Sequence, residues 1–86
     1  MTYRVTLLPH AAKDLDQLEG KLVDQVTAAI AQLADETRPH GCVKLSDEEN
    51  GYRIRVRDIR ILYRINDKAR EIIVYRVKHR RESYRR

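Results

Sequence analysis

Arginines recur at almost every second position between Gly51 and Ile65, in the segment GYRIRVRDIRILYRI. Only one acidic residue, Asp58, lies among the five: Arg53, Arg55, Arg57, Arg60 and Arg64. A guanidinium group stays charged at physiological pH, and its planar fork of N–H donors matches two oxygens of a phosphate. The pattern therefore indicates phosphate binding, and it raises the question of whether the phosphate is only bound or also made to react.

The apolar residues that alternate with these arginines predict two antiparallel strands joined by a turn at 57–58. Successive side chains of a strand point to opposite faces of the sheet. We therefore expect the apolar side chains to pack beneath helices and the arginines to project together from the opposite face. A third strand is expected to continue the sheet, with Ile73, Tyr75 and Val77 facing inward and Arg76 extending the arginine face.

The N-terminal part of the chain supplies the elements expected to cover this sheet. Alternation between Tyr3 and Leu7 predicts a first strand, and Pro9 fits the first turn of a following helix. Apolar residues at three- and four-residue spacing predict a helical hairpin that breaks at Gly20 and ends by Arg38, before a loop over residues 39–50. The apolar stripe of the second helix consists of Leu22, Val26, Ala29, Ile30 and Leu33.

Together these elements predict an α+β fold with the order βααβββ. The expected sheet has four strands and is mainly antiparallel, the N-terminal helical hairpin covers one face, and a short helical tail follows the last strand. The 86 residues are expected to form a single domain, 1–86.

Charge divides unequally between the two parts of the chain. Residues 1–51 contain five Lys/Arg and nine Asp/Glu, a net charge of −4, whereas residues 52–86 contain thirteen and four, a net charge of +9. Such an asymmetry favours a polyanionic partner for the C-terminal part.

Composition excludes several classes of protein. No uncharged run approaches the roughly 20 residues needed to cross a bilayer, so no membrane role is expected. The single cysteine, Cys42, allows no intrachain disulfide, which fits a reducing cytoplasm. His10 and His40 are isolated, and no spacing of His, Cys or carboxylates suits a metal, so neither a metal nor a cofactor is expected.

Two segments carry a resemblance to a known family: KLSDEENGYRIRVRDIRILYRI, which begins at Lys44, and VYRVKHRRESYRR, which begins at Val74. They resemble the K-L, Y-R-I-R-x-G-x-Y-R-x-x-Y and V-x-H-R-x-x-x-Y-R motifs of the RelE branch of the RelE/ParE toxin superfamily. The likeness extends over essentially the whole chain, including the N-terminal strand and helical hairpin.

The resemblance implies the toxin component of a type II toxin–antitoxin system, acting in the cytoplasm. RelE toxins are ribosome-dependent mRNA endoribonucleases (mRNA interferases), which inhibit translation by cleaving A-site mRNA through attack of an RNA 2′-hydroxyl. The implied partners are a cognate antitoxin, the ribosome and mRNA, with operator DNA bound only through the toxin–antitoxin complex.

Transferred position by position, the catalytic residues of the family fall on Arg53, Arg55, Arg60, Arg80 and Tyr84. Further contacts with RNA are predicted at Lys44, Arg57, Arg64, Arg81 and Arg85. The chain departs from the pattern at two hairpin positions, with Arg57 in place of a glycine and Ile59 in place of an aromatic residue. The first change is expected to alter the turn, and the second removes a surface for base stacking.

Cleavage by a 2′-hydroxyl requires a base, an acid and cations around the pentavalent phosphate. Arg60 and Arg80 suit the stabilisation of charge. Arg53 and Arg55 stay protonated, so they are expected to bind phosphate rather than to abstract a proton. The candidates for proton transfer are Tyr84 and His79.

Two other functions stay open on the same fold. A ParE-like toxin would inhibit gyrase without nuclease chemistry, and a degenerate toxin would be a non-catalytic RNA- or ribosome-binding module. The closely spaced basic residues and the HRRESY ending favour the RelE interpretation. The acidic segment SDEEN at 46–50 is expected to be a solvated turn, with a screen over the site or a contact with the antitoxin as alternatives.

Overall fold

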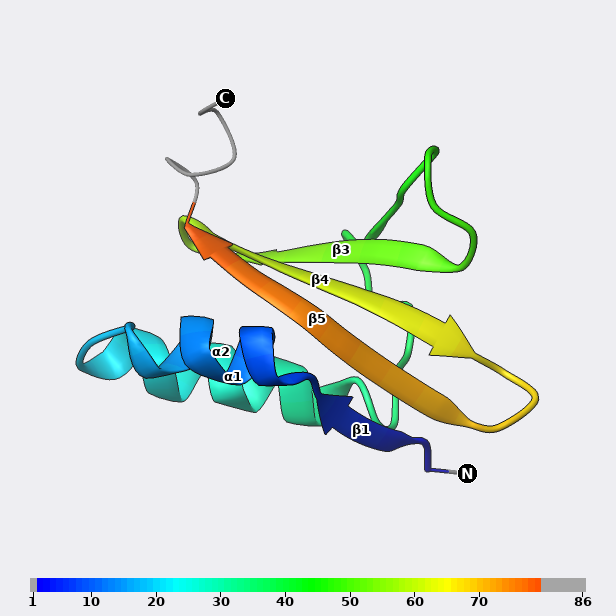
Figure 1. The fold of residues 1–86 in the computed structure, drawn as a ribbon, viewed down its shortest axis with the longest axis horizontal. Coiled ribbons are helices and arrows are strands. Elements are labelled where there is room, and N and C mark those ends of the chain that lie inside the picture. The colour runs from blue at the N-terminus through cyan, green and yellow to red at the C-terminus, as the bar shows by residue number, and fades with distance from the viewer. Residues whose placement is uncertain (1, 80–86) are drawn as a thin grey trace.

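The computed structural model describes residues 2–79, in which two helices lie on one side of a five-stranded sheet (Figure 1). The elements in chain order are β1 (Arg4–Leu7), α1 (Pro9–Asp16), α2 (Lys21–Gln32), β2 (Val43–Lys44), β3 (Gly51–Val56), β4 (Ile59–Asn66) and β5 (Glu71–His79). The strand order is β1-β5-β4-β3-β2, with β1 parallel to β5 and the other pairs antiparallel. The predicted α+β order is confirmed, with β2 as a fifth, short strand inside the expected loop. The predicted helical tail lies outside the described residues.

The helical hairpin forms where the sequence predicts it. Pro9 is the first residue of α1, where its missing N–H costs no hydrogen bond. Gly20 separates the helices with a φ of +61°, a left-handed conformation that glycine adopts without a steric penalty. Within residues 2–79, neither helix combines the length and apolar character that a bilayer crossing requires.

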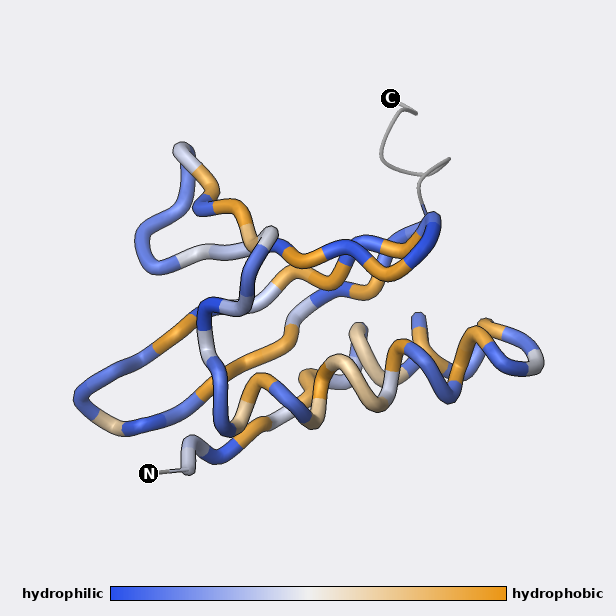
Figure 2. The backbone as a smooth tube through the Cα atoms, turned by 180° about the vertical axis from the view of Figure 1, so that it is seen from behind, coloured by the Kyte–Doolittle hydropathy of each residue, from blue (hydrophilic) through white to orange (hydrophobic). Residues whose placement is uncertain are grey.

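A single apolar layer lies between the helices and the sheet. In Figure 2 the hydrophobic segments of the helices face those of the strands across this layer. Its buried members are Ala11, Val26, Ile30, Leu33, Ile54, Ile59, Ile61, Tyr63, Ile65, Ile72, Val74 and Val77. Tyr63 is fully buried, and its hydroxyl donates to the carbonyl oxygen of Thr37 at 2.8 Å. Burial raises the pKa of this phenol, so it remains a hydrogen-bond donor.

A β-bulge in β5 changes which of its side chains reach this layer. Tyr63 pairs with Val74 and Ile61 pairs with Val77, so β5 advances three residues where β4 advances two. A bulge of this kind shifts the alternation of faces by one residue. Tyr75 lies on the outer face by regular alternation from Ile72 and Val74, and the bulge then returns Val77 to the core.

The bulge corrects the prediction for the last strand. The alternation in the sequence places Ile73 and Tyr75 inside, but the buried neighbours are Ile72 and Val74. The prediction for Val77 is confirmed. After the bulge, Lys78 points to the outer face, where it pairs with Arg60 of β4.

Asp14 of α1 holds the bulge in place. Its Oδ2 accepts hydrogen bonds from the Val77 N–H at 2.9 Å and from Arg76 Nε at 2.7 Å. Desolvation by itself would raise the pKa of Asp14. The hydrogen bonds from Arg76 and Val77 outweigh it and hold this pKa below its ordinary value. Arg76 therefore points toward α1, and the prediction that it extends the arginine face is wrong.

Candidate nucleic-acid interface

The sheet face opposite the helices carries a row of three cations near the β3–β4 turn. Arg55 of β3 pairs with Arg60 of β4, and Arg60 pairs with Lys78 of β5. Directly paired residues project to the same face, and neighbouring strands lie about 4.8 Å apart, so the three Cα atoms fall within about 10 Å. Arg55 is exposed, while Arg60 and Lys78 are partly buried. We call these three residues the cationic row.

Arg53 lies on the same face, one pair of residues further along β3. It pairs with Leu62 of β4 on one side and with Val43 of β2 on the other. The prediction that Arg53, Arg55 and Arg60 share one face is therefore confirmed by the strand register. Arg60 is in the middle strand of the row, and its Nε is buried.

Arg57 does not belong to this face. It is the first residue of the β3–β4 turn and has a φ of +57°, which few residues other than glycine adopt. Its Nε donates to Oε1 of Gln25 in α2 at 3.0 Å, so the side chain reaches toward the helices. The prediction that Arg57 projects with Arg53 and Arg55 is wrong, because strand alternation ends where the turn begins.

Two further predicted site residues also lie on the helix side of the sheet. Lys44 pairs with Tyr52, and its Nζ lies 5.3 Å from the centroid of the Tyr52 ring. His79 pairs with the buried Ile59, which faces the helices. The structure therefore does not bring Lys44 or His79 to the cationic row. The remaining predicted site residues lie outside the described part of the chain and stay predictions: Arg80, Arg81, Tyr84 and Arg85.

At the other end of the outer face, a glutamate carboxylate binds an arginine and a tyrosine. The Arg64 guanidinium carbon lies 4.5 Å from the centroid of the Tyr75 ring. Oε1 of Glu48 accepts a hydrogen bond from the Tyr75 hydroxyl at 3.1 Å and lies 3.3 Å from a terminal nitrogen of Arg64. Burial and the hydrogen bond to Glu48 raise the pKa of Tyr75 to about 12. We call Glu48, Arg64 and Tyr75 the Glu48 cluster.

The Glu48 cluster changes the interpretation of the acidic segment. The connection between β2 and β3 rises on the side of the sheet away from the helices (Figure 1). Glu48, at its centre, is partly buried and is bound to the arginine face rather than fully solvated. This position agrees with the alternative in which the segment screens part of the site.

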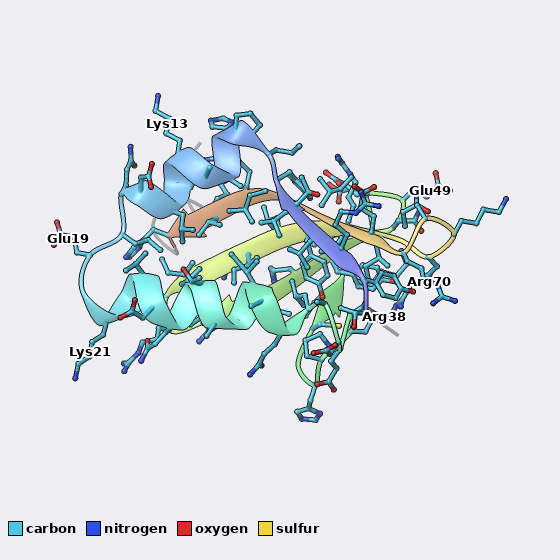
Figure 3. All side chains as sticks on the ribbon, turned by 90° about the horizontal axis from the view of Figure 1, so that it is seen from below. Lys13, Glu19, Lys21, Arg38, Glu49 and Arg70 are labelled. Atoms are coloured by element: carbon cyan, nitrogen blue, oxygen red, sulfur yellow. The ribbon has the colours of Figure 1, made fainter. Side chains whose placement is uncertain are left out.

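A second polar cluster lies away from the outer face. Arg38 donates to the Tyr52 hydroxyl at 3.2 Å and to Asp67 Oδ2 at 3.0 Å. The Tyr3 hydroxyl donates to Asp67 Oδ1 at 2.6 Å, which raises the pKa of Tyr3 and lowers that of Asp67. Arg38 lies at the end of the molecule away from the α1–α2 turn (Figure 3). This cluster ties β1 to the β4–β5 turn and has a structural role.

Lys78 is the site residue that sequence reasoning missed. Of the lysines in residues 2–79, it is the one that the register places on the outer face. The predicted alternation, with Val77 inside, already places Lys78 on the outer face beside Arg60. The signal was therefore present in the sequence, but the prediction of site residues considered the arginines and not this lysine. Among the described residues, no three His, Cys, Asp or Glu side chains are placed to hold a metal ion.

A basic α+β domain with an open cationic face is a fold suited to binding a polyanion. Residues 5–84 match the sequence model of the ParE toxins of type II toxin–antitoxin systems, parDE. The chain therefore belongs to this toxin family, within the RelE/ParE superfamily. A comparison with curated protein sequences found no match.

Solved structures of RelE proteins share the fold. The archaeal RelE–RelB complex from Pyrococcus horikoshii OT3 is 28% identical over 93% of this chain and 97% of that chain, with a TM-score of 0.82. The toxin–antitoxin complex RelBE2 from Mycobacterium tuberculosis is also 28% identical, over 93% and 100%, with a TM-score of 0.80. The intact RelBE complex of E. coli is 20% identical over 90% and 95%, with a TM-score of 0.78, and shows the likeness in fold alone.

Proposed function

We propose that the protein is a ribosome-dependent mRNA endoribonuclease that cleaves A-site mRNA by attack of the 2′-hydroxyl on the adjacent phosphate. The observation that supports this proposal is the cationic row, three positive side chains on neighbouring strands of an open sheet face. Like charges that lie directly opposite each other on neighbouring strands destabilise a sheet. A phosphate bound between these cations would offset that cost, which favours a binding role over a purely structural one.

Arg60 is the residue expected to stabilise the transition state. Negative charge builds on the phosphate oxygens as the 2′-oxygen attacks, and fixed donors aimed at that charge can contribute several kcal/mol. Arg60 sits between Arg55 and Lys78, and burial of its Nε limits how far the guanidinium can move. Arg53 and Arg55 bind the flanking phosphates, and Arg80 and Tyr84 of the C-terminal segment join the site in this proposal.

Lys78 is our candidate for the general base. Lysine amines serve as general bases in enzymes, whereas the guanidinium group of an arginine stays protonated. Lys78 lies directly opposite Arg60, so its amine can reach the same phosphate. His79 lies on the other face of the sheet, which makes it a weaker candidate for this step. Positioning of mRNA in the ribosomal A site supplies the remaining alignment of the reacting groups.

We also propose that a cognate antitoxin covers the protein, and that operator DNA is bound only through the complex. β2 pairs with only Tyr52 and Arg53 of β3, so the edge at 54–56 has no described partner strand. A groove of about 230 Å³ between α2 and this edge is lined in part by Ala29, Leu33 and Ile54. An added strand or an amphipathic helix with acidic flanks fits such an edge and groove.

Primer extension on cellular mRNA after induction of the protein tests the nuclease proposal. The wild type should arrest growth and produce new 5′ ends at a fixed position within codons. Arg60→Ala should abolish both effects while the purified variant keeps its circular dichroism spectrum. The matched control is Arg4→Ala, because Arg4 is exposed at the start of β1, two strands from Arg60 and opposite Glu71 at the far end of β5 from Lys78. Growth arrest with intact transcripts would contradict the proposal.

Gyrase inhibition is the second candidate, because the matching family model is that of the ParE toxins. It predicts an SOS response and accumulated cleaved DNA in induced cells while mRNA stays whole. Tolerance of overexpression without either effect would instead indicate a non-catalytic RNA- or ribosome-binding module.

A further inference from the structure

We propose that Arg64 and Tyr75 form a stacking subsite for a base of single-stranded RNA, and that Glu48 occupies this subsite in the free protein. The inference rests on the proposed function, because the same RNA would be held at the cationic row. It adds a second contact on the outer face and a residue of the protein itself that competes for it.

The geometry of Arg64 and Tyr75 suits a base. The guanidinium lies 4.5 Å from the centroid of the Tyr75 ring, so the ring supports one of its faces. The Arg64 side chain is 48% exposed, which leaves part of its surface open to solvent. Proteins hold unstacked RNA bases on aromatic rings and on guanidinium planes in this manner.

The subsite lies at a usable distance from the cationic row. Arg64 and Arg60 are four residues apart on β4 and point to the same face, so they are separated by about 13 Å. A single strand covers that distance in roughly two to four nucleotides, taking about 3.4 Å per nucleotide when stacked. Leu62 and Arg53 lie between the two positions and offer an apolar contact and a cation along the way.

Glu48 holds the groups that RNA would use. Its Oε1 binds both the Arg64 guanidinium and the Tyr75 hydroxyl, and its carboxylate repels a phosphate backbone. A partly exposed ion pair of this kind contributes little to stability, so RNA can displace it at small cost. The contact is therefore suited to release when the ligand arrives.

Backbone packing at Gly51 controls the position of Glu48. The Gly51 N–H donates to the Glu48 carbonyl at 3.4 Å, and the Leu45 N–H donates to the Gly51 carbonyl at 2.9 Å. A Cβ at Gly51 would come within 2.9 Å of the Glu48 Cβ, closer than real Cβ contacts. Gly51→Ala should therefore move Glu48 off Arg64 without removing its charge.

Binding of single-stranded RNA tests the subsite. The probe is a fluorescein-labelled oligonucleotide of six adenosines, compared with oligonucleotides that carry one abasic nucleotide at each position in turn. We expect the Glu48→Gln variant to bind RNA about tenfold more weakly when one particular position is abasic. The same abasic position should have little effect on RNA binding by the Arg64→Ala variant. Stacking on an aromatic platform has effects of this size. Glu48→Gln and Gly51→Ala should both bind the intact RNA about threefold to tenfold more tightly than the wild type.

Glu49→Gln is the matched control for charge. Glu49 is exposed on the same connection, and its side chain points away from the body of the molecule (Figure 3). The Glu49→Gln variant loses the same charge as Glu48→Gln, and its affinity for RNA should change by less than about twofold. Tyr75→Phe, which keeps the ring and loses one anchor of Glu48, should bind like Glu48→Gln, whereas Tyr75→Leu should lose the dependence on the abasic position.

Two outcomes overturn the subsite while the proposed function stands. The first outcome is that Glu48→Gln and Glu49→Gln raise the affinity for RNA equally, for intact and abasic oligonucleotides alike. Glu48 would then act only through its negative charge. The other is an unchanged nucleotide preference around the cut sites in cellular mRNA for both Glu48→Gln and Arg64→Ala, while Arg60→Ala abolishes cleavage. If no variant binds RNA and none cleaves transcripts, the proposed function fails and the subsite fails with it.

Discussion

The two ends of the outer sheet face carry the same residue type in opposite surroundings. At the end near the β3–β4 turn, Arg55, Arg60 and Lys78 lie side by side in the cationic row. At the other end, Arg64 stacks on Tyr75 and is held by the Glu48 carboxylate. Strand alternation brings all of these side chains to one face, and the connection between β2 and β3 places the Glu48 carboxylate against Arg64.

This difference assigns different roles to the two ends. A row of cations concentrates positive potential, which suits charge that develops during a reaction. A guanidinium that is already paired with a carboxylate binds a phosphate less strongly, but its flat surface can still stack on a base. In the proposed function, the reaction therefore belongs at the cationic row and recognition of a neighbouring base at the Glu48 cluster.

The largest expected effect separates the two ends directly. Arg60→Ala should lower the rate of mRNA cleavage on programmed ribosomes by about 10²–10³-fold, because it removes a donor aimed at the developing charge. Arg64→Ala should lower the same rate by less than about tenfold, the size expected for one stacked base. Equal losses in the two variants would contradict the division of roles.

Lys78→Arg sharpens the comparison within the cationic row. The variant keeps the positive charge but stays protonated, so cleavage should fall by about a hundredfold while binding of single-stranded RNA is kept. Single-turnover cleavage and fluorescence anisotropy measure the two quantities separately. A Lys78→Arg protein with full activity would exclude Lys78 as the base.

Asp14→Asn tests how much the contact of Asp14 with Arg76 and Val77 at the bulge contributes to stability. The Asp14 and Arg76 side chains are 14% and 28% exposed, so the variant leaves a mostly buried guanidinium without its carboxylate. We expect a loss of about 2–3 kcal/mol in the free energy of unfolding, measured with urea. Lys68→Gln, a change at an exposed turn residue, should cost less than about 0.5 kcal/mol.

The same carboxylate predicts a pH dependence. The pKa of Asp14 is lower in the folded protein than in the unfolded chain, so its contribution to stability is present above about pH 4. That contribution should be lost as the pH falls through the folded pKa. Between pH 5 and pH 2 the wild type should therefore lose more stability than Asp14→Asn does, as measured by urea unfolding at each pH.

Arg57→Gly has the smallest expected effect and checks that Arg57 is outside the row. A left-handed conformation costs a non-glycine residue about 1–2 kcal/mol, and the exposed hydrogen bond to Gln25 offsets part of it. Glycine at this position should raise the free energy of unfolding by about 0.5–1 kcal/mol. The rate of mRNA cleavage should stay near that of the wild type. A loss of rate comparable to that of Arg60→Ala would show that Arg57 takes part in cleavage.

The sequence predicted the parts of the fold and site that follow from local alternation. Arg53, Arg55 and Arg60 were found because β3 and the start of β4 are regular strands. The inward and outward residues of β5 before Val77 were misassigned because the bulge depends on Asp14, 63 residues away from Val77 in the chain. The contact of Glu48 with Arg64 depends likewise on the path of a loop, which residue types alone do not determine.

Arg57 shows a different limit of such prediction. The sequence predicted the turn at 57–58, as observed, but the strand alternation was extended one residue too far, to Arg57. The family pattern has glycine at this position, and the observed φ of +57° gives that glycine a physical reason.

The pairing of β1 with β5 has a consequence for the order of assembly. Leu7 pairs with Val74, so the first strand finds its partner only when the last described strand is present. Asp14 likewise finds Arg76 and Val77 only then. A nascent or truncated chain that stops before β5 therefore lacks both the pairing of β1 with the rest of the sheet and the cation that Lys78 adds beside Arg60.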